Sequence, residues 1–381
     1  MIRMGALLGA WLLTFVSVAA AAWSPPAPLE SDETVIVFPT LVTREAAPSS
    51  ADAAAAEWVV FLRGWVFERE LDSDWRGEFI EEVGEELGLT DEEIGSSLFQ
   101  TRARGFLSDN ERGEEVQVEV AGRVFTLPET NRDGHSQIGI RLTDAELRGA
   151  AGEPVPGKSR SLELKVLNAG RAEVICPPAR VVEPDATIVV CDIDDTIKIS
   201  NIGGDKAGVV QTALVEPFRP VPGMADLCNR FAATGAAFWY LSASPWQLYE
   251  PLDAFLTESG FPRGGITLRE FRWKDERFFN LFEDPREFKL TELRRLLERF
   301  DGHRFVLIGD TTEHDAEVYA AIAREFPGRV ARVVVRATPG DEVGKTRAQK
   351  AMMDLPAGVR VDMFEDPGSV QPGASEAKEG E

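Results

Sequence analysis

Acidic and hydroxyl side chains directly follow two apolar runs of the sequence, at the points where buried strands would end. Asp192 and Asp194 come just after Thr187–Val190, and Ser242 comes just after Ala236–Leu241. Residues two apart on an extended chain point to the same side, so the two carboxylates can share one site. The further candidates, placed in or near later elements, are Thr196, Lys289, Asp310 and Asp315.

Clustered carboxylates of this kind favour a magnesium site. Several carboxylates repel one another unless a cation lies among them, and hard oxygen ligands select Mg²⁺. Asp192 and Asp310 are the expected ligands, with Asp315 behind them. The alternative is that acidic residues after strands simply cap helices. That alternative suits Asp192 alone, but it does not explain an ordered set in which each member follows its own element.

A carboxylate held beside Mg²⁺ is suited to phosphoryl transfer. The ion would keep Asp192 ionised, ready to attack phosphorus as a nucleophile. Asp194 is expected to protonate the leaving oxygen and later to activate water. Ser242 and Lys289 would hold the phosphoryl oxygens by hydrogen bond and charge.

Apolar runs alternate with helical patterns in the second half of the chain, which predicts an α/β domain with a doubly wound parallel sheet. Thr187–Val190 is a continuous apolar run, as expected of a strand that is buried on both faces. Similar runs occur at 236–241, 305–308 and 330–335, with apolar stripes of helical spacing between them. Ligands of such sheets bind beyond the carboxyl ends of the strands, where the candidate residues lie.

The first half of the chain is expected to form a smaller, sandwich-like β-rich domain. Val116, Val118 and Val120 alternate with polar residues, which is typical of half-buried strands. The expected organisation is a signal peptide at 1–22, a linker and leading strand at 23–57, the β-rich domain at 58–180, the α/β domain at 185–340, a C-terminal extension at 341–365 and a disordered acidic tail at 366–381.

The ordered motifs resemble those of the haloacid dehalogenase-like phosphohydrolase superfamily. They are Asp192-x-Asp194-x-Thr196, then Ser242, Lys289, and the pair Asp310 and Asp315. Within the superfamily the chain is most similar to the bacterial branch of the actin-patch-protein type of phosphatidate phosphatase. The phrases that carry this similarity are DIDDTIKIS at 192–200, RPVPGMA at 219–225, YLSASPWQL at 240–248 and GDTTEHDAEVY at 309–319. The resemblance covers about residues 185–340, and RGWVF at 63–67 resembles the accessory domain of this family.

The resemblance implies Mg²⁺-dependent hydrolysis of phosphatidate to diacylglycerol and phosphate through an aspartyl-phosphate. By motif matching, Asp192 is the nucleophile and Asp194 the general acid and base. Ser242, Lys289 and Thr196 form the phosphate-binding group, in which Ser244 competes with Ser242 and Thr196 supports the loop. The metal ligands implied by the resemblance are Asp192, Asp194, Asp310 and Asp315.

The composition disfavours several classes of protein. Asp and Glu number 64 against 41 Lys and Arg, and the net charge of −23 disfavours nucleic acid as a partner. The three cysteines are too few and too scattered for a disulfide scaffold or a zinc site. The expected partner is a phosphorylated lipid at a membrane surface, and no protein partner is predictable. Residues 269–279 interleave basic and aromatic side chains, which suits lipid contact and a solvated helix face equally.

The N-terminus predicts export. Arg3 precedes an apolar run from Met4 to Val18, and the small residues Ala19–Ala22 fit a cleavage site after Ala22. A periplasmic location is therefore expected, with an uncleaved N-terminal anchor as the alternative.

Two alternatives to a lipid phosphatase remain open at this point. The first is a phosphatase for a soluble or other phosphorylated substrate. The second is a non-catalytic binding or scaffold protein, which is disfavoured because all four motif positions carry chemically competent side chains.

Overall fold

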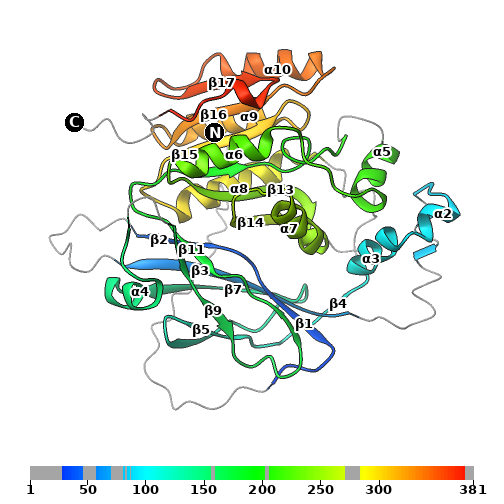
Figure 1. The fold of residues 1–381 in the computed structure, drawn as a ribbon, viewed down its shortest axis with the longest axis vertical. Coiled ribbons are helices and arrows are strands. Elements are labelled where there is room, and N and C mark those ends of the chain that lie inside the picture. The colour runs from blue at the N-terminus through cyan, green and yellow to red at the C-terminus, as the bar shows by residue number, and fades with distance from the viewer. Residues whose placement is uncertain are drawn as a thin grey trace, which may run out of the picture.

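The computed structural model describes residues 28–45, 57–69, 80–81, 84–85, 87–155, 159–201, 206–270 and 284–373. These residues form a β-rich half and a half built on a parallel sheet. In Figure 1 the β-rich half lies at the bottom and the parallel-sheet half at the top. The predicted signal peptide, the linker residues 23–27 and 46–56, and residues 271–279 of the basic and aromatic segment lie outside the described residues. None of the helices described has the length and apolar character that a membrane crossing requires.

The β-rich half is centred on a long strand, β3, in an eight-stranded sheet. The strands of this sheet are β1 (Glu33–Val37), β2 (Leu41–Arg44), β3 (Trp58–Glu68), β4 (Asp109–Asn110), β7 (His135–Leu142), β8 (Arg160–Leu162), β10 (Glu173–Ile175) and β11 (Ala179–Val181). A three-stranded sheet is formed by β6 (Arg123–Thr126), β5 (Gln117–Val120) and β9 (Leu164–Val166). Helices of this half with described bounds are α2 (Asp91–Ile94), α3 (Ser97–Phe106) and α4 (Asp144–Ala151).

Antiparallel pairing dominates this half, and its two sheets share one apolar core. β3 pairs antiparallel with β1, β2, β4 and β7, whereas β1 with β10 and β2 with β11 are parallel pairs. Val60 and Leu62 of β3 lie in the same cluster as Val118 and Val120 of β5. The predicted β-rich region is thus confirmed, and the leading strand expected in 23–57 corresponds to both β1 and β2.

The described residues of the second half contain six strands that all pair in parallel. They are β12 (Ile188–Cys191), β13 (Ala237–Pro245), β14 (Gly264–Arg269), β15 (Phe305–Asp310), β16 (Val330–Arg336) and β17 (Arg360–Phe364). Their order across the sheet is β14-β13-β12-β15-β16-β17. The chain therefore starts in the middle, builds outward on one side and then crosses to the other. The crossing places a topological switch point between β12 and β15, where ligands of such sheets bind.

Helices pack on both faces of the parallel sheet. Their bounds are α5 (Lys206–Val210), η2 (Gln211–Val215), α6 (Met224–Ala233), η3 (Trp246–Leu248), α7 (Tyr249–Glu258), α8 (Arg286–Arg299), α9 (Asp315–Glu325), α10 (Glu342–Met352) and η5 (Pro367–Ser369). Val189 and Cys191 of β12 face the cluster that includes α6 and α7. Ile188 and Val190 face the cluster that includes α8, α9 and α10. Burial on both faces explains the continuous apolar run, and the predicted α/β half with a parallel sheet is confirmed.

The two outer strands and α10 are absent from the sequence prediction. β14 begins with two glycines, and β17 is half exposed at the sheet edge. Neither gives the uninterrupted apolar run that marks a central strand. The predicted C-terminal extension at 341–365 contributes α10 and β17 to this half of the molecule.

Residues 366–373 correct the prediction of a disordered tail over that stretch. Arg230 of α6 donates hydrogen bonds to the carbonyl oxygens of Pro367 and Val370, and the Val370 side chain is buried. These contacts with α6 hold the segment, although its composition is polar. Residues 374–381 of the predicted tail lie outside the described residues.

The two halves share an apolar core. Phe38 and Trp65 from the β-rich half belong to the same buried cluster as Tyr240, Trp246 and Tyr249 from the parallel-sheet half. This shared cluster fixes the β-rich half against the end of β13.

Candidate active site

Three carboxylates converge at the carboxyl ends of the two central strands. The backbone N–H of Asp192 donates to Ile308 O at 2.9 Å, which places Asp192 directly after β12 and beside β15. Asp310 ends β15, and Asp315 begins α9. These three side chains are buried, and an oxygen from each lies within 4.8 Å of the others. The structure thus brings together three of the predicted metal ligands.

Gly309 permits this close approach. A Cβ at this position would lie 2.3 Å from Asp315 Oδ2, well inside van der Waals contact. The backbone N–H of Asp310 donates to the same oxygen at 3.2 Å. The first turn of α9 therefore packs directly on the end of β15, and only glycine fits between them.

Lys289 of α8 is a buried cation among carboxylates. Its Nζ lies 2.8 Å from Asp192 Oδ1, 2.7 Å from Glu313 Oε2 and 2.6 Å from Asp315 Oδ1. Burial alone would lower the pKa of Lys289, but the surrounding carboxylates, Asp192 first, raise it well above its usual value. Lys289 is therefore charged, and its present partners are carboxylates. Glu313 is a site residue that sequence reasoning missed.

One lysine does not balance the carboxylates around it. Burial raises the pKa of Asp192 well above its ordinary range, although Lys289 opposes the shift. Burial, followed by the charge of Asp315, raises the pKa of Asp310 to about 7. Burial raises the pKa of Glu313 to about 8, again against Lys289. The described residues of the site therefore supply less positive charge than its carboxylates need in order to be ionised together.

Asp194 has a different environment, rich in donors. Its Oδ1 lies 2.7 Å from Lys198 Nζ and accepts from Ser200 Oγ at 2.7 Å. Its Oδ2 accepts from Ser242 Oγ at 2.8 Å and from Ser244 Oγ at 2.9 Å. Burial opposes ionisation, but Lys198 and these hydrogen bonds prevail and hold the pKa of Asp194 below its usual value.

Lys198 and Ser200 were missed at the sequence level, although both lie in the quoted phrase at 192–200. The chain turns back after Asp194, where Asp195 has a φ of 51° and Asp195 Oδ1 accepts from the N–H groups of Ser200 and Asn201. This turn brings Lys198 and Ser200 onto Asp194. A pattern of alternating residues does not reveal a turn of this kind.

Thr196 supports a carboxylate rather than facing an open site. Its hydroxyl donates to Asp310 Oδ2 at 3.0 Å, and Thr312 donates to Asp310 Oδ1. Ser244 N–H donates to Ser242 Oγ at 2.9 Å, so the two serines that compete for the phosphate role are linked. The side chains of Thr196 and Ser242 are both buried.

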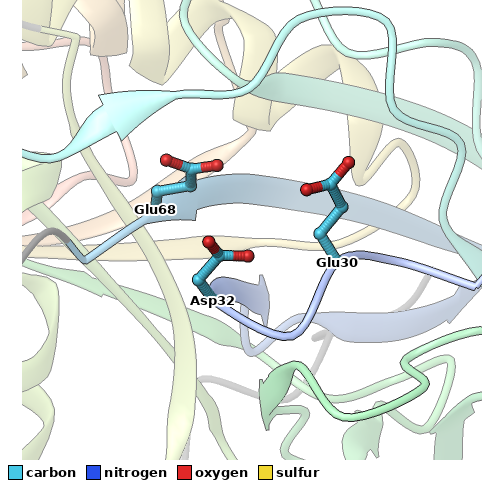
Figure 2. Close-up of side chains that lie close together, drawn as sticks. All are labelled: Glu30, Asp32 and Glu68. Atoms are coloured by element: carbon cyan, nitrogen blue, oxygen red, sulfur yellow. The ribbon is translucent and has the colours of Figure 1, made fainter.

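A second group of three carboxylates lies in the β-rich half, and it differs from the first in its exposure to water. Figure 2 shows Glu30, Asp32 and Glu68, whose carboxylate oxygens also lie within 4.8 Å of one another. Glu30 and Asp32 are exposed and Glu68 is partly exposed, so water screens their repulsion. The buried group around Asp192 has no such screening.

A family model matches the parallel-sheet half, and two curated relatives match longer stretches of the chain. Residues 187–337 match the model of a protein family described as phosphatidate phosphatase APP1, catalytic domain. The chain is 29% identical over 206 residues to an uncharacterized protein of Schizosaccharomyces pombe, covering 53% of this chain and 33% of that protein. It is 26% identical over 260 residues to phosphatidate phosphatase APP1 of Saccharomyces cerevisiae, covering 66% of this chain and 42% of that protein.

The matched segment, residues 187–337, includes every residue described above around Asp192 and Asp194. The acidic group of Glu30, Asp32 and Glu68 lies outside it. The matches span 33% and 42% of the curated relatives, so those relatives extend well beyond the similar region. Residues 187–337 are therefore similar to the APP1 catalytic-domain family, and this similarity supports a phosphatase enzyme.

Proposed function

We propose that this protein is a Mg²⁺-dependent phosphatase that converts phosphatidate to diacylglycerol and phosphate through an aspartyl-phosphate on Asp192. The observation that carries the proposal is the state of the Asp192 carboxylate. Its Oδ2 is buried at the end of the central strand and has no hydrogen-bond partner among the described residues. An attacking oxygen needs an unblocked lone pair, and a buried polar atom left unpaired at a strand end is a mark of function. The name of the yeast relative supplies the substrate.

The residues present fit a divalent cation. Asp192, Asp310 and Asp315 offer hard oxygen ligands close to one another, and Asp192 Oδ2 has no other described partner. A bound Mg²⁺ would neutralise the developing charge on the transferred phosphoryl group. Asp194 is the fourth proposed ligand, through its backbone carbonyl, because its carboxylate is already bound by Lys198 and three serines.

Asp192 and Asp194 have separate tasks in the proposed reaction. An oxygen of Asp192 forms a bond to phosphorus while the bond from phosphorus to the ester oxygen breaks, and the leaving oxygen takes a proton from Asp194. Water, deprotonated by Asp194, then cleaves the aspartyl-phosphate and returns Asp192. Without a cation the two pKa values run against these tasks, because burial raises the pKa of Asp192 and the donors around Asp194 hold its pKa below the usual value. The proposed roles therefore need a bound cation beside Asp192, which would favour its ionised form, and a change in the partners of Asp194.

The serines offer a way to supply the proton. Ser242 and Ser244 now donate to the ionised form of Asp194. In the proposed complex they turn to the phosphate oxygens. The loss of two hydrogen bonds to the charged form then raises the pKa of Asp194 and favours its protonated form. Lys289 is the proposed second phosphate ligand, released from the carboxylates as they bind the cation.

We propose that the second half has the doubly wound fold of the haloacid dehalogenase-like superfamily. The strand order and the helices on both faces support this assignment. The candidate residues also lie at the switch point between β12 and β15, where such a fold binds its ligand. Export to the periplasm remains a proposal that rests on the sequence of residues 1–22.

The substrate is tested by measuring phosphate release from phosphatidate in mixed micelles and from a panel of soluble phosphate esters. We expect Mg²⁺-dependent release with a clear preference for phosphatidate, and none after thorough chelation. Preference for soluble esters would replace the lipid with a soluble substrate. Activity in the chelated sample would reject the metal site, and inactivity towards every ester would favour the binding or scaffold protein.

The raised carboxyl pKa values predict a pH-dependent stability that Mg²⁺ removes. Asp310 and Glu313 have folded pKa values of about 7 and about 8, above those of the unfolded chain. The folded state therefore binds more protons, and the melting temperature of the chelated protein is expected to fall between about pH 5 and about pH 8.5. Excess Mg²⁺ should raise it more at the higher pH, because fewer protons then compete with the cation. The measurement is thermal unfolding across this range, with and without Mg²⁺.

Asp310→Asn is the control for this pH effect, because it removes one of the two carboxyls. Its melting temperature should depend less steeply on pH. An equal slope in the variant, or an equal effect of Mg²⁺ at both ends of the range, would contradict the prediction.

A further inference from the structure

The backbone that carries Ser242 and Ser244 is released from its sheet. β13 pairs with β14 in register as far as Leu241 and Thr267, and the next pair is Pro245 with Arg269. Four steps along β13 thus oppose two along β14, so β13 bulges at Ser242–Ser244. The ladder does not set where the two hydroxyls point, although both bind Asp194. Besides these hydrogen bonds, the packing of the residues that follow the bulge bears on this stretch.

Trp246 is one of these residues, and side chains of the β-rich half surround it. Its indole is buried two residues after Ser244 and lies 4.1 Å from the Phe38 ring, centroid to centroid. The His135 ring is 5.9 Å away, and Arg63 Cζ lies 4.6 Å above the indole. All three neighbours come from the β-rich half, outside the segment that matches the catalytic-domain family.

The β-rich half also holds the elements on either side of the bulge. Arg63 forms an ion pair with Glu270, which follows the end of β14. α3 approaches the turn after the bulge so closely that a Cβ on Gly105 would lie 3.1 Å from Gln247 O. The contacts therefore bracket the serine segment, at the end of β14 and in the turn after β13.

We propose that the β-rich half positions Ser242 and Ser244 for the reaction, with Trp246 as the positioning residue that transmits its contacts. The inference rests on the proposed function, and it gives the accessory half a task in the chemistry rather than in substrate recruitment. A buried aromatic ring that packs against several neighbours fixes the backbone of the residues on either side of it. Displacing a phosphate-binding hydroxyl by about 1 Å costs on the order of 10²-fold in turnover.

The test compares Trp246→Leu with Trp58→Leu in the full chain. Trp58 is also a buried tryptophan, in the core of the β-rich half, and it donates a hydrogen bond to Asp144. Trp58→Leu therefore removes a buried indole of the same size without touching the bulge. We expect kcat to fall by about 10²-fold in Trp246→Leu and to stay within about 3-fold in Trp58→Leu, with the larger change in kcat rather than KM. Trp246→Phe should restore most of the loss.

Amide hydrogen exchange gives a readout that does not depend on activity. The amides of residues 242–244 should exchange faster in Trp246→Leu but not in Trp58→Leu. If the wild-type protein hydrolyses no phosphate ester, the proposed function fails, while the exchange data still decide the positioning. Equal kcat in the two Leu variants, or unchanged exchange at 242–244, would overturn the inference. If Trp246→Leu does not fold, Phe38→Leu tests the same contact with the same criteria.

Discussion

Asp192→Asn is expected to abolish phosphate release while the protein stays folded. An amide oxygen is a poor nucleophile, and loss of a residue central to covalent catalysis costs on the order of 10⁴- to 10⁶-fold in turnover. Stability should be unchanged or higher, because burial raises the pKa of Asp192 and so disfavours the carboxylate that the variant removes. The measurements are phosphate release in Mg²⁺ and thermal unfolding of the same preparation.

Glu33→Gln is the matched control. Glu33 is a buried carboxylate on β1 in the β-rich half, and burial raises its pKa to about 7. The variant removes a buried carboxyl remote from the site and should keep wild-type turnover. If Asp192→Asn keeps turnover as well, the aspartyl-phosphate is excluded. If Asp192→Asn loses activity only because it unfolds, its melting curve shows the unfolding.

Lys289→Met is expected to cause the largest loss of stability among the site variants. The ammonium contacts three carboxylates and is fully buried, so the variant leaves Asp192, Glu313 and Asp315 without their shared cation. Removing one partner of a buried ion pair costs about 3–5 kcal/mol. Turnover should fall as well, since the proposed phosphate ligand is gone. The measurement is denaturant unfolding at neutral pH in chelator.

Lower pH should recover part of this loss, because the unpaired carboxyls then become neutral by protonation. Lys345→Met is the comparison, since the partners of Lys345, Glu342 and Glu365, are exposed. Stability near that of the wild type is expected there. Lys289→Met with wild-type stability at neutral pH would show that the buried carboxyls do not depend on Lys289.

The central strands and the main site carboxylates were predictable because local patterns encode them. Burial on both faces makes β12 a continuous apolar run, and Asp192 follows that run directly. The donors around the carboxylates were not predictable in the same way. Lys198 reaches Asp194 through a turn at Asp195, and Glu313 reaches Lys289 from a loop. Both contacts depend on backbone directions that no apolar periodicity records.

The same limit applies to the sheet edges and to the contact between the halves. β17 is half exposed, so its sequence lacks the apolar run that marks central strands. The sequence around Phe38 shows only an apolar residue after a strand. It does not indicate that the ring packs against Trp246, which lies 208 positions later. Apolar patterns predict which side chains are buried, whereas the partner of each one is fixed by the tertiary fold.

The shared aromatic cluster has a thermodynamic consequence for the chain. Detaching either half would expose Trp65, Phe38 and Trp246 together, an apolar surface that water disfavours strongly. Partial unfolding of one half therefore removes much of the energy that keeps the other folded. The molecule is thus expected to melt as a single cooperative unit, and exchange of its accessory half for an unrelated one would need a matching aromatic face.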